Sequence, residues 1–140
     1  MRMNHLNLTV PDVARSRELF ETYFGLKCVA EMGRNALAVL VDDSGFVLTL
    51  NNFEKATEVQ YPGLFHIGFM QESKERVDEI NARLKSGGFD VEAPHELHGA
   101  WTFFFRAPGG FLVEVGHQHR GPRGPEGARG VQSSFHPAEA

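Results

Sequence analysis

An internal repeat constrains the fold of this chain more than any other feature of its sequence. His5 is matched 61 positions later by His66, and at the same interval the apolar residue Leu19 is matched by the apolar residue Ile80. A constant interval between unrelated residue types indicates that a supersecondary unit has been duplicated. Because 140 residues suffice for one domain and leave little room for two independent cores, we expect one domain built from two copies of a half.

The first copy is predicted to form a strand, a helix and three strands. Residues 5–10 alternate polar and apolar side chains, which is typical of a half-buried strand. Pro11 and Asp12 then favour the start of a helix, which ends at Gly25. Three strands are predicted after that helix, over residues 26–32, 36–41 and 46–50, with turn-forming residues between them.

The second copy repeats this order. A strand is predicted over residues 65–70, and a helix is predicted from Ser73, the counterpart of Asp12, to Lys85. The three strands predicted after the helix cover residues 90–93, 101–106 and 111–116. The fold class is therefore α+β, with two βαβββ modules.

The two modules and the C-terminal segment define the expected domain organisation. One module spans about residues 3–52 and the other about residues 63–118, so that a single domain covers residues 1–118. Residues 119–140 are rich in Gly and Pro and lack apolar periodicity, and we predict that they form a disordered tail.

Composition narrows the choice of partners. The formal net charge of −4 offers no attraction for nucleic acid, and no apolar segment approaches the roughly 20 residues of a membrane span. The N-terminus lacks the apolar stretch of a signal peptide, and the single cysteine, Cys28, excludes an internal disulfide. These features favour a cytoplasmic protein whose partner is a small molecule.

Three of the predicted strands each carry one potential metal ligand on the face that points away from the helices. The apolar residues that alternate with His5, His66 and Glu114 are expected to face the core, so these three side chains point to the opposite face. Two imidazoles and one carboxylate form the donor set that suits Fe(II) in non-haem oxygenases. Mn(II) is also compatible with these ligands, and Zn(II) is a further alternative for the metal.

Four segments around these ligands point to a known family. They are NHLNLTVPD with His5, YFGL at the end of the first helix, FHIGF with His66 and APGGFLVEV with Glu114. Together they resemble the vicinal oxygen chelate superfamily, which includes glyoxalase I, extradiol dioxygenases, fosfomycin-resistance enzymes and bleomycin-binding proteins. The resemblance covers roughly residues 3–118. It implies two βαβββ modules that curl around a cleft, a divalent metal held at its floor, and a homodimer.

The first module is expected to lack a fourth ligand. Glyoxalase I, as the resemblance implies, adds a carboxylate on the last strand of its first module, and aligning the two copies places that position at Leu48. Leucine cannot bind a metal, which favours a three-ligand site. An apolar wall is expected around that site, made of Leu48, Leu50, Met70, Phe104 and Leu112.

Other side chains on or near these strands are candidates for catalysis or substrate binding. Extradiol enzymes carry a tyrosine at the position that Phe104 occupies, so ordinary catechol cleavage lacks its usual hydroxyl here. His95 and His98, in a predicted loop, and Thr102 are the catalytic candidates. Asn7, Trp101 and Arg106 are candidates for substrate binding, with packing against a helix as the alternative for Trp101.

The first hypothesis for function is an Fe(II) dioxygenase-type enzyme whose small organic substrate chelates the metal through two adjacent oxygens. An alternative is a Mn(II) enzyme of the fosfomycin-resistance or glyoxalase type, with lyase, transferase or epoxide-hydrolase chemistry. A phosphonate substrate would need cations, and only Arg106 is expected on the cleft side. The alternative from another class is a protein that binds a drug or metabolite without turnover. Metal binding distinguishes it, because bleomycin-binding relatives usually lack the three ligands.

Overall fold

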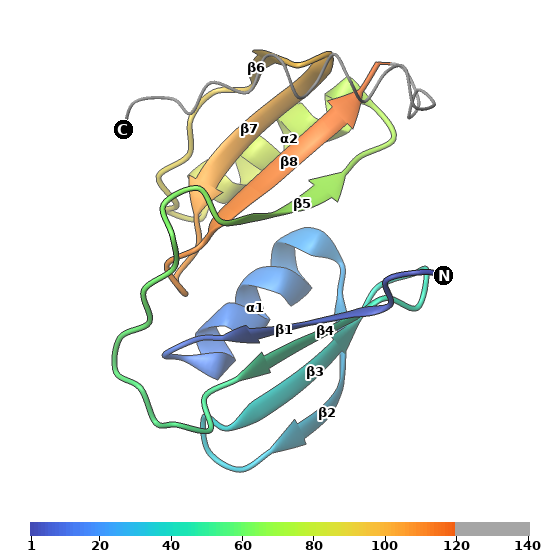
Figure 1. The fold of residues 1–140 in the computed structure, drawn as a ribbon. Coiled ribbons are helices and arrows are strands. Elements are labelled where there is room, and N and C mark those ends of the chain that lie inside the picture. Colours follow the sequence, from blue (N-terminus) through green and yellow to red (C-terminus); the bar gives the residue numbers. More distant parts are fainter. Residues whose placement is uncertain (120–140) are drawn as a thin grey trace. The chain divides into compact units, whose positions relative to one another are not determined.

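The computed structural model describes residues 1–119, and the tail predicted for residues 119–140 therefore lies almost wholly outside the described residues. The described chain divides into two compact units. Each unit holds one helix and one four-stranded sheet (Figure 1). The predicted pair of βαβββ modules, and with it the α+β class, is confirmed.

The first unit comprises Met1–Gly63 and the short segment Arg106–Phe111. Its elements are β1 (His5–Thr9), α1 (Val13–Phe24), β2 (Lys27–Met32), β3 (Leu37–Val41) and β4 (Val47–Asn51). The strands form a sheet in the order β1-β4-β3-β2, in which β1 runs parallel to β4 and the other neighbours are antiparallel.

Helix α1 begins and ends where the sequence predicts. The side chain of Asp12 accepts a hydrogen bond from the backbone N–H of Arg15 at 3.0 Å, which satisfies one of the free amides of the first turn. Gly25 ends the helix in the left-handed conformation, at a φ of 69°, which is unfavourable for residues with a Cβ. Leu19 and Phe20 are buried on the side of the helix that faces the core.

The second unit comprises Leu64–Phe105 and, among the described residues, 112–119. Its elements are β5 (His66–Met70), α2 (Lys74–Ser86), β6 (His95–Leu97), β7 (Ala100–Arg106) and β8 (Leu112–Gln118). The sheet order is β5-β8-β7-β6, with β5 parallel to β8. Helix α2 is capped by Ser73 as predicted.

No helix of the described part of the chain is long and apolar enough to cross a membrane.

The prediction of a strand over residues 90–93 is wrong. Only Val91 forms an isolated bridge there, with Phe105, and Pro94 interrupts the backbone N–H groups that a longer strand would need. The segment predicted as a loop around His95 instead forms β6, which pairs with β7. His98 and Gly99 make the two-residue turn between these strands, and both have a positive φ, as a tight hairpin turn requires.

Candidate metal centre

His66 and Glu114 lie together on the face of the second sheet that points away from α2. Strand β5 pairs with β8 so that Gly68 lies opposite Glu114, and alternation along β5 gives His66 the same face as Gly68. The Nε2 atom of His66 lies 3.6 Å from Oε2 of Glu114. The two side chains are 37% and 20% exposed, so an ion or a small molecule can reach both.

The hydrogen bonds of His66 fit a metal ligand. Its Nδ1 atom lies 2.9 Å from the carbonyl oxygen of Leu64, and because a carbonyl only accepts, this assigns the proton to Nδ1. In the neutral imidazole, Nε2 then carries the lone pair, and this nitrogen is the one that lies beside the carboxylate of Glu114. Two donor atoms that are each about 2.1 Å from one ion lie at most about 4.2 Å apart, so the 3.6 Å separation suits a shared metal.

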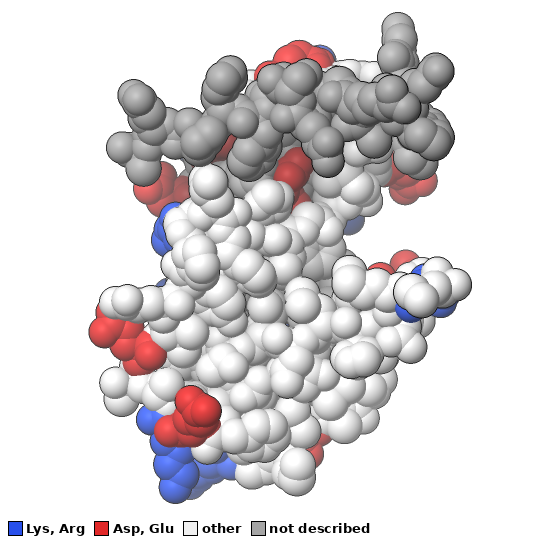
Figure 2. Space-filling model, in the orientation of Figure 1, with Lys and Arg blue, Asp and Glu red and all other residues white. Residues whose placement is uncertain are grey.

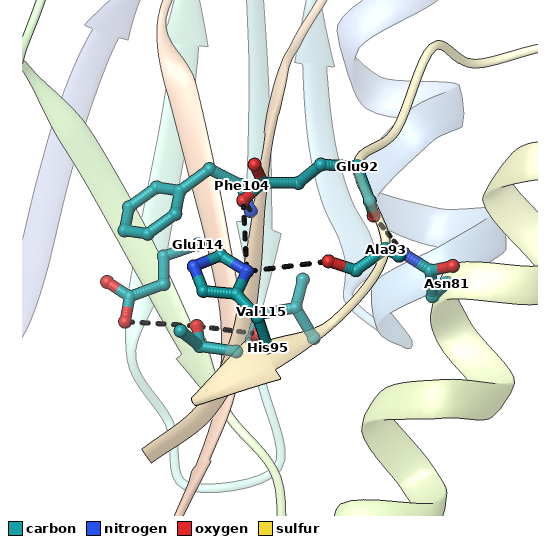
Figure 3. A network of polar contacts seen from close by, with 8 residues as sticks. Asn81, Glu92, Ala93, His95, Phe104, Glu114 and Val115 are labelled. Atoms are coloured by element: carbon teal, nitrogen blue, oxygen red, sulfur yellow. Dashed lines mark hydrogen bonds and ion pairs between the residues drawn. The ribbon is translucent and has the colours of Figure 1, made fainter. Parts of the chain in front are cut away.

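Thr102 on β7 holds the other carboxylate oxygen of Glu114. Its Oγ1 atom lies 3.2 Å from Oε1 of Glu114 and 3.0 Å from the carbonyl oxygen of Val115. The side chain is 1% exposed, so water does not compete for its single hydroxyl proton. The two acceptor oxygens are the partners of this proton, and they hold the hydroxyl in place. Figure 3 shows Glu114 and Val115 with these contacts.

Three apolar residues border the His66–Glu114 pair. The ring of Phe104 meets the imidazole of His66 edge to face, with centroids 5.5 Å apart. Leu112 lies opposite His66 in the β5–β8 register, and Met70, two positions beyond Gly68, is 52% exposed on the same face. Their role in substrate binding remains a prediction.

Gly116 keeps this face open, which sequence reasoning missed. A Cβ atom at Gly116 would lie 2.9 Å from Oγ1 of Thr102 and 3.3 Å from Cε of Met70. Any larger residue would therefore displace the hydroxyl that holds Glu114. The sequence offered no signal, because a lone glycine in an apolar strand is equally consistent with a bulge.

His95 shares this face through its strand. It lies opposite Thr102 in the β6–β7 register, which places both side chains on one side of the sheet. Its Nδ1 atom lies 3.4 Å from the carbonyl oxygen of Ala93 and 3.8 Å from Oε1 of Glu92 (Figure 3). Glu92 was not predicted as part of the site. Its side chain accepts a hydrogen bond from the backbone N–H of Phe104 at 2.9 Å. The carboxylate thus replaces the backbone carbonyl that a neighbouring strand would offer to this N–H.

His5 and Asn7 lie on β1 in the first unit, on the face away from the core. The Nδ1 atom of His5 lies 2.7 Å from Oδ1 of Asn4, so Nε2 is the nitrogen left for another ligand. Asn51, which is 8% exposed, donates a hydrogen bond to Oδ1 of Asn7 at 2.6 Å and fixes its amide. The described residues contain no group of three or more His, Cys, Asp or Glu side chains that could hold a metal, so the complete ligand set remains a proposal.

The structure overturns the assignment of Leu48 and Leu50 to the open face. They are 3% and 0% exposed, and they pair with Leu6 and Leu8 on the buried face of the first sheet. Asn7 pairs with Thr49 as Gly68 pairs with Glu114, so the counterpart of Glu114 is Thr49. The sequence alignment was one residue out of register, and a one-residue shift exchanges the faces of a strand. The first module still lacks a carboxylate at this position.

Trp101 packs against helix α2, which is the alternative to substrate binding that the sequence offered. Its indole Nε1 donates a hydrogen bond to Oδ1 of Asp78 at 2.7 Å, and Nζ of Lys74 lies 3.8 Å from the ring centroid. Both partners belong to α2. The amphipathic indole satisfies its N–H on the helix, and it therefore faces away from Glu114.

Two further candidates occupy turns. Arg106 ends β7, and its guanidinium donates a hydrogen bond to the carbonyl oxygen of Gly110 at 2.8 Å within the turn that leads to β8. His98 lies in the β6–β7 turn. On the face shown in Figure 2, uncharged residues cover most of the visible surface of the first unit, and both acidic and basic side chains are confined to small patches.

The family is shown by comparison with known proteins. Residues 2–115 match the model of the Glyoxalase/Bleomycin resistance protein/Dioxygenase superfamily, and the chain belongs to this superfamily. The comparison with curated proteins finds no match.

Solved structures share the fold. A structure of a possible glyoxalase from Bacillus cereus is 56% identical, with a TM-score of 0.74 over 82% of this chain and 97% of that one. Lactoylglutathione lyase from Agrobacterium tumefaciens is 22% identical, with a TM-score of 0.68 over 83% and 92% of the two chains. The fosfomycin resistance protein FosX from Listeria monocytogenes is 18% identical, with a TM-score of 0.68 over 81% and 89%.

Proposed function

We propose that this protein is a divalent-metal-dependent enzyme in which His5, His66 and Glu114 hold the metal. Its substrate is a small organic molecule that binds the metal through two adjacent oxygens. The observation that carries the proposal is the His66–Glu114 pair, in which Nε2 lies 3.6 Å from a carboxylate oxygen while Nδ1 is hydrogen-bonded to a backbone carbonyl.

The chain's own residues prepare this site. A bound metal supplies a Lewis acid and a template for the substrate. The carbonyl of Leu64 fixes the imidazole of His66, and the hydroxyl of Thr102 fixes Glu114, so neither ligand needs to reorganise on metal binding. Phe104 and Met70 offer apolar surface beside the pair, which suits an apolar part of the substrate.

The metal and reaction that we favour are Fe(II) and an oxygenase-type reaction, because two imidazoles and one carboxylate are the donor set of such enzymes. Phe104 offers no hydroxyl for proton transfer. His95 shares the face of Thr102, and its Nδ1 atom is oriented towards Ala93 and Glu92, so we assign the acid–base role to His95 rather than to the turn residue His98.

A glyoxalase-type or fosfomycin-resistance-type reaction with Mn(II) or Zn(II) is the second candidate. The similarity to the Bacillus cereus structure, at 56% identity, favours it. Thr49 at the position of a fourth carboxylate ligand and the engagement of Arg106 within its own turn weigh against it. Proteins of this superfamily often dimerise, and our proposal includes a homodimer, a single domain over residues 1–118 and a cytoplasmic location.

Metal-dependent turnover tests the proposal. Apoprotein is loaded anaerobically with Fe(II), Mn(II) or Zn(II), and oxygen uptake and product formation are followed with catechols, hydroxy-keto acids and epoxides. We expect Fe(II)-dependent oxygen uptake that Glu114→Gln abolishes and that Glu72→Gln, in an exposed loop, leaves unchanged. Turnover of an epoxide with Mn(II), without oxygen uptake, would favour the second candidate. Binding of a small molecule without any metal requirement would overturn both.

A further inference from the structure

A second pair of histidines lies outside the site described above. His117 is on β8 and His119 follows the end of that strand, with ring centroids 5.7 Å apart and ring planes at 89°. Alternation along β8 places His117 on the opposite face from Glu114. The backbone N–H of His119 donates a hydrogen bond to the carbonyl of Gly99 at 3.2 Å, which anchors the chain at this point.

Each of these imidazoles has one nitrogen tied to an acceptor. Nδ1 of His117 lies 2.9 Å from the carbonyl oxygen of Gln71, and Nε2 of His119 lies 2.8 Å from Oε1 of Glu96. A carbonyl and a carboxylate can only accept, so both tied nitrogens carry protons. In the neutral rings the lone pairs therefore lie on Nε2 of His117 and on Nδ1 of His119.

The pattern of these contacts is that of metal-bound histidines. Such histidines generally donate their second N–H to a carboxylate or a backbone carbonyl, which orients the ring and makes the ligating nitrogen more basic. Here one ring has each kind of partner. The carboxylate of Glu96 also brings a negative charge to the pair, which favours a bound cation.

We propose that Nε2 of His117 and Nδ1 of His119 form a second, two-histidine site for a divalent transition metal, with water completing the coordination. Imidazole nitrogen suits Zn(II), Ni(II) and Cu(II). With each nitrogen about 2.1 Å from the ion and each ring centroid about 1.2 Å farther, two rings on one ion have centroids at most about 6.6 Å apart, and the observed 5.7 Å lies within that limit. This site shares no residue with the proposed function and does not depend on it.

Calorimetric titration with ZnCl2 tests the site. The full chain carries His66→Ala and Glu114→Gln, so that the candidate metal centre on the other face is removed. We expect one equivalent of Zn(II) to bind, and His119→Ala to weaken binding by at least about 100-fold. Glu96→Gln should weaken it by about 10- to 100-fold, as loss of a carboxylate partner does. His95→Ala, a histidine on the face of Thr102, is the matched control and should leave Zn(II) affinity unchanged.

Nitrogen-15 NMR of the imidazoles identifies the atoms. Without metal, the proton is expected on Nδ1 of His117 and on Nε2 of His119, and Zn(II) should shift the other nitrogen of each ring. His119 is 40% exposed, so His119→Ala is expected to fold even where His117→Ala does not. Absence of Zn(II) binding in the parent variant, or unchanged affinity in His119→Ala, would overturn the proposal.

Discussion

The hydroxyl of Thr102 lies 3.2 Å from one carboxylate oxygen of Glu114, while the other carboxylate oxygen lies 3.6 Å from Nε2 of His66. One carboxylate oxygen of Glu114 is thus held by Thr102, and the other is left for a ligand beside His66. Because Thr102 is almost fully buried, its contact with Glu114 is set by the packing of the sheet rather than by solvent. We infer that Thr102 is a positioning residue, which would act on the proposed metal through Glu114.

Thr102→Val tests this role, because valine keeps the shape and removes the hydroxyl. Loss of a buried hydrogen bond to Glu114 and Val115 should lower the free energy of unfolding by about 1–2 kcal/mol. Metal affinity should fall by about 10- to 100-fold, because an outer partner of a ligand is lost. Chemical denaturation and metal titration measure the two effects.

Thr102→Ser is the matched control for that variant. Serine retains the hydroxyl, so metal affinity should stay within a few-fold of the wild type. If Thr102→Val loses stability but keeps its metal affinity, the hydroxyl supports only the fold.

Gly116→Ala should damage the same contact from the opposite side. The new Cβ atom would lie 2.9 Å from Oγ1 of Thr102, so the threonine must shift away from Glu114. We expect a loss of about 1–3 kcal/mol in the free energy of unfolding, together with weaker metal binding. Gly63→Ala is the control, since no heavy atom lies within 4 Å of its Cβ position, and it should change stability by less than about 0.5 kcal/mol. Equal effects of the two substitutions would refute the packing argument.

Asp42 should contribute to the acid sensitivity of the fold. Burial by itself would raise the pKa of Asp42, but hydrogen bonds from the Ser44 hydroxyl and from backbone N–H groups, including that of Phe46, outweigh it and lower the pKa. A carboxyl whose pKa is lower in the folded state stabilises the fold above its unfolded pKa of about 3.9 and loses this contribution as the pH falls through the folded value.

The substitution Asp42→Asn isolates the charge, since asparagine still accepts hydrogen bonds in such a turn. It should destabilise the fold at pH 7, and the difference from wild type should shrink as the pH falls below about 4. Urea denaturation from pH 7 to pH 2 gives the comparison, with Asp43→Asn at the next position as the control. A difference that stays constant with pH would show that the charge of Asp42 has no part in stability.

Alternation within single strands made the second module's open face predictable. Because Ile67 and Phe69 alternate with His66, and Val113 and Val115 flank Glu114, period-two burial alone identifies which side each ligand takes. The structure agrees on both strands. The helices were predictable for a similar reason, because the caps Asp12 and Ser73 act on their own first turns.

Contacts between strands were less predictable. The counterpart of Glu114 was assigned to Leu48 by counting along the chain, and the actual register places it at Thr49, because loop lengths differ between the copies. For Trp101 the sequence leaves two partners open, a substrate and a helix, and in the structure its N–H donates to Asp78 on α2. Neither partner can be read from one segment, since the pairing depends on where other elements pack.

The role of Glu92 had no sequence signal at all. Its side chain takes the place of a neighbouring strand for the N–H of Phe104, where Pro94 prevents a regular ladder. A carboxylate in an irregular segment is most often solvated, and nothing in its spacing distinguishes this one.

Metal content per chain tests the central claim most directly. Protein carrying His119→Ala, which removes the second proposed site, is reconstituted anaerobically with Fe(II), desalted and analysed for iron. The account predicts about one Fe(II) per chain, falling below about 0.1 when His5→Ala, His66→Ala or Glu114→Gln is added, with the fold retained by circular dichroism. Stoichiometric iron in the His66→Ala or Glu114→Gln protein, or none in the His119→Ala parent, would contradict it.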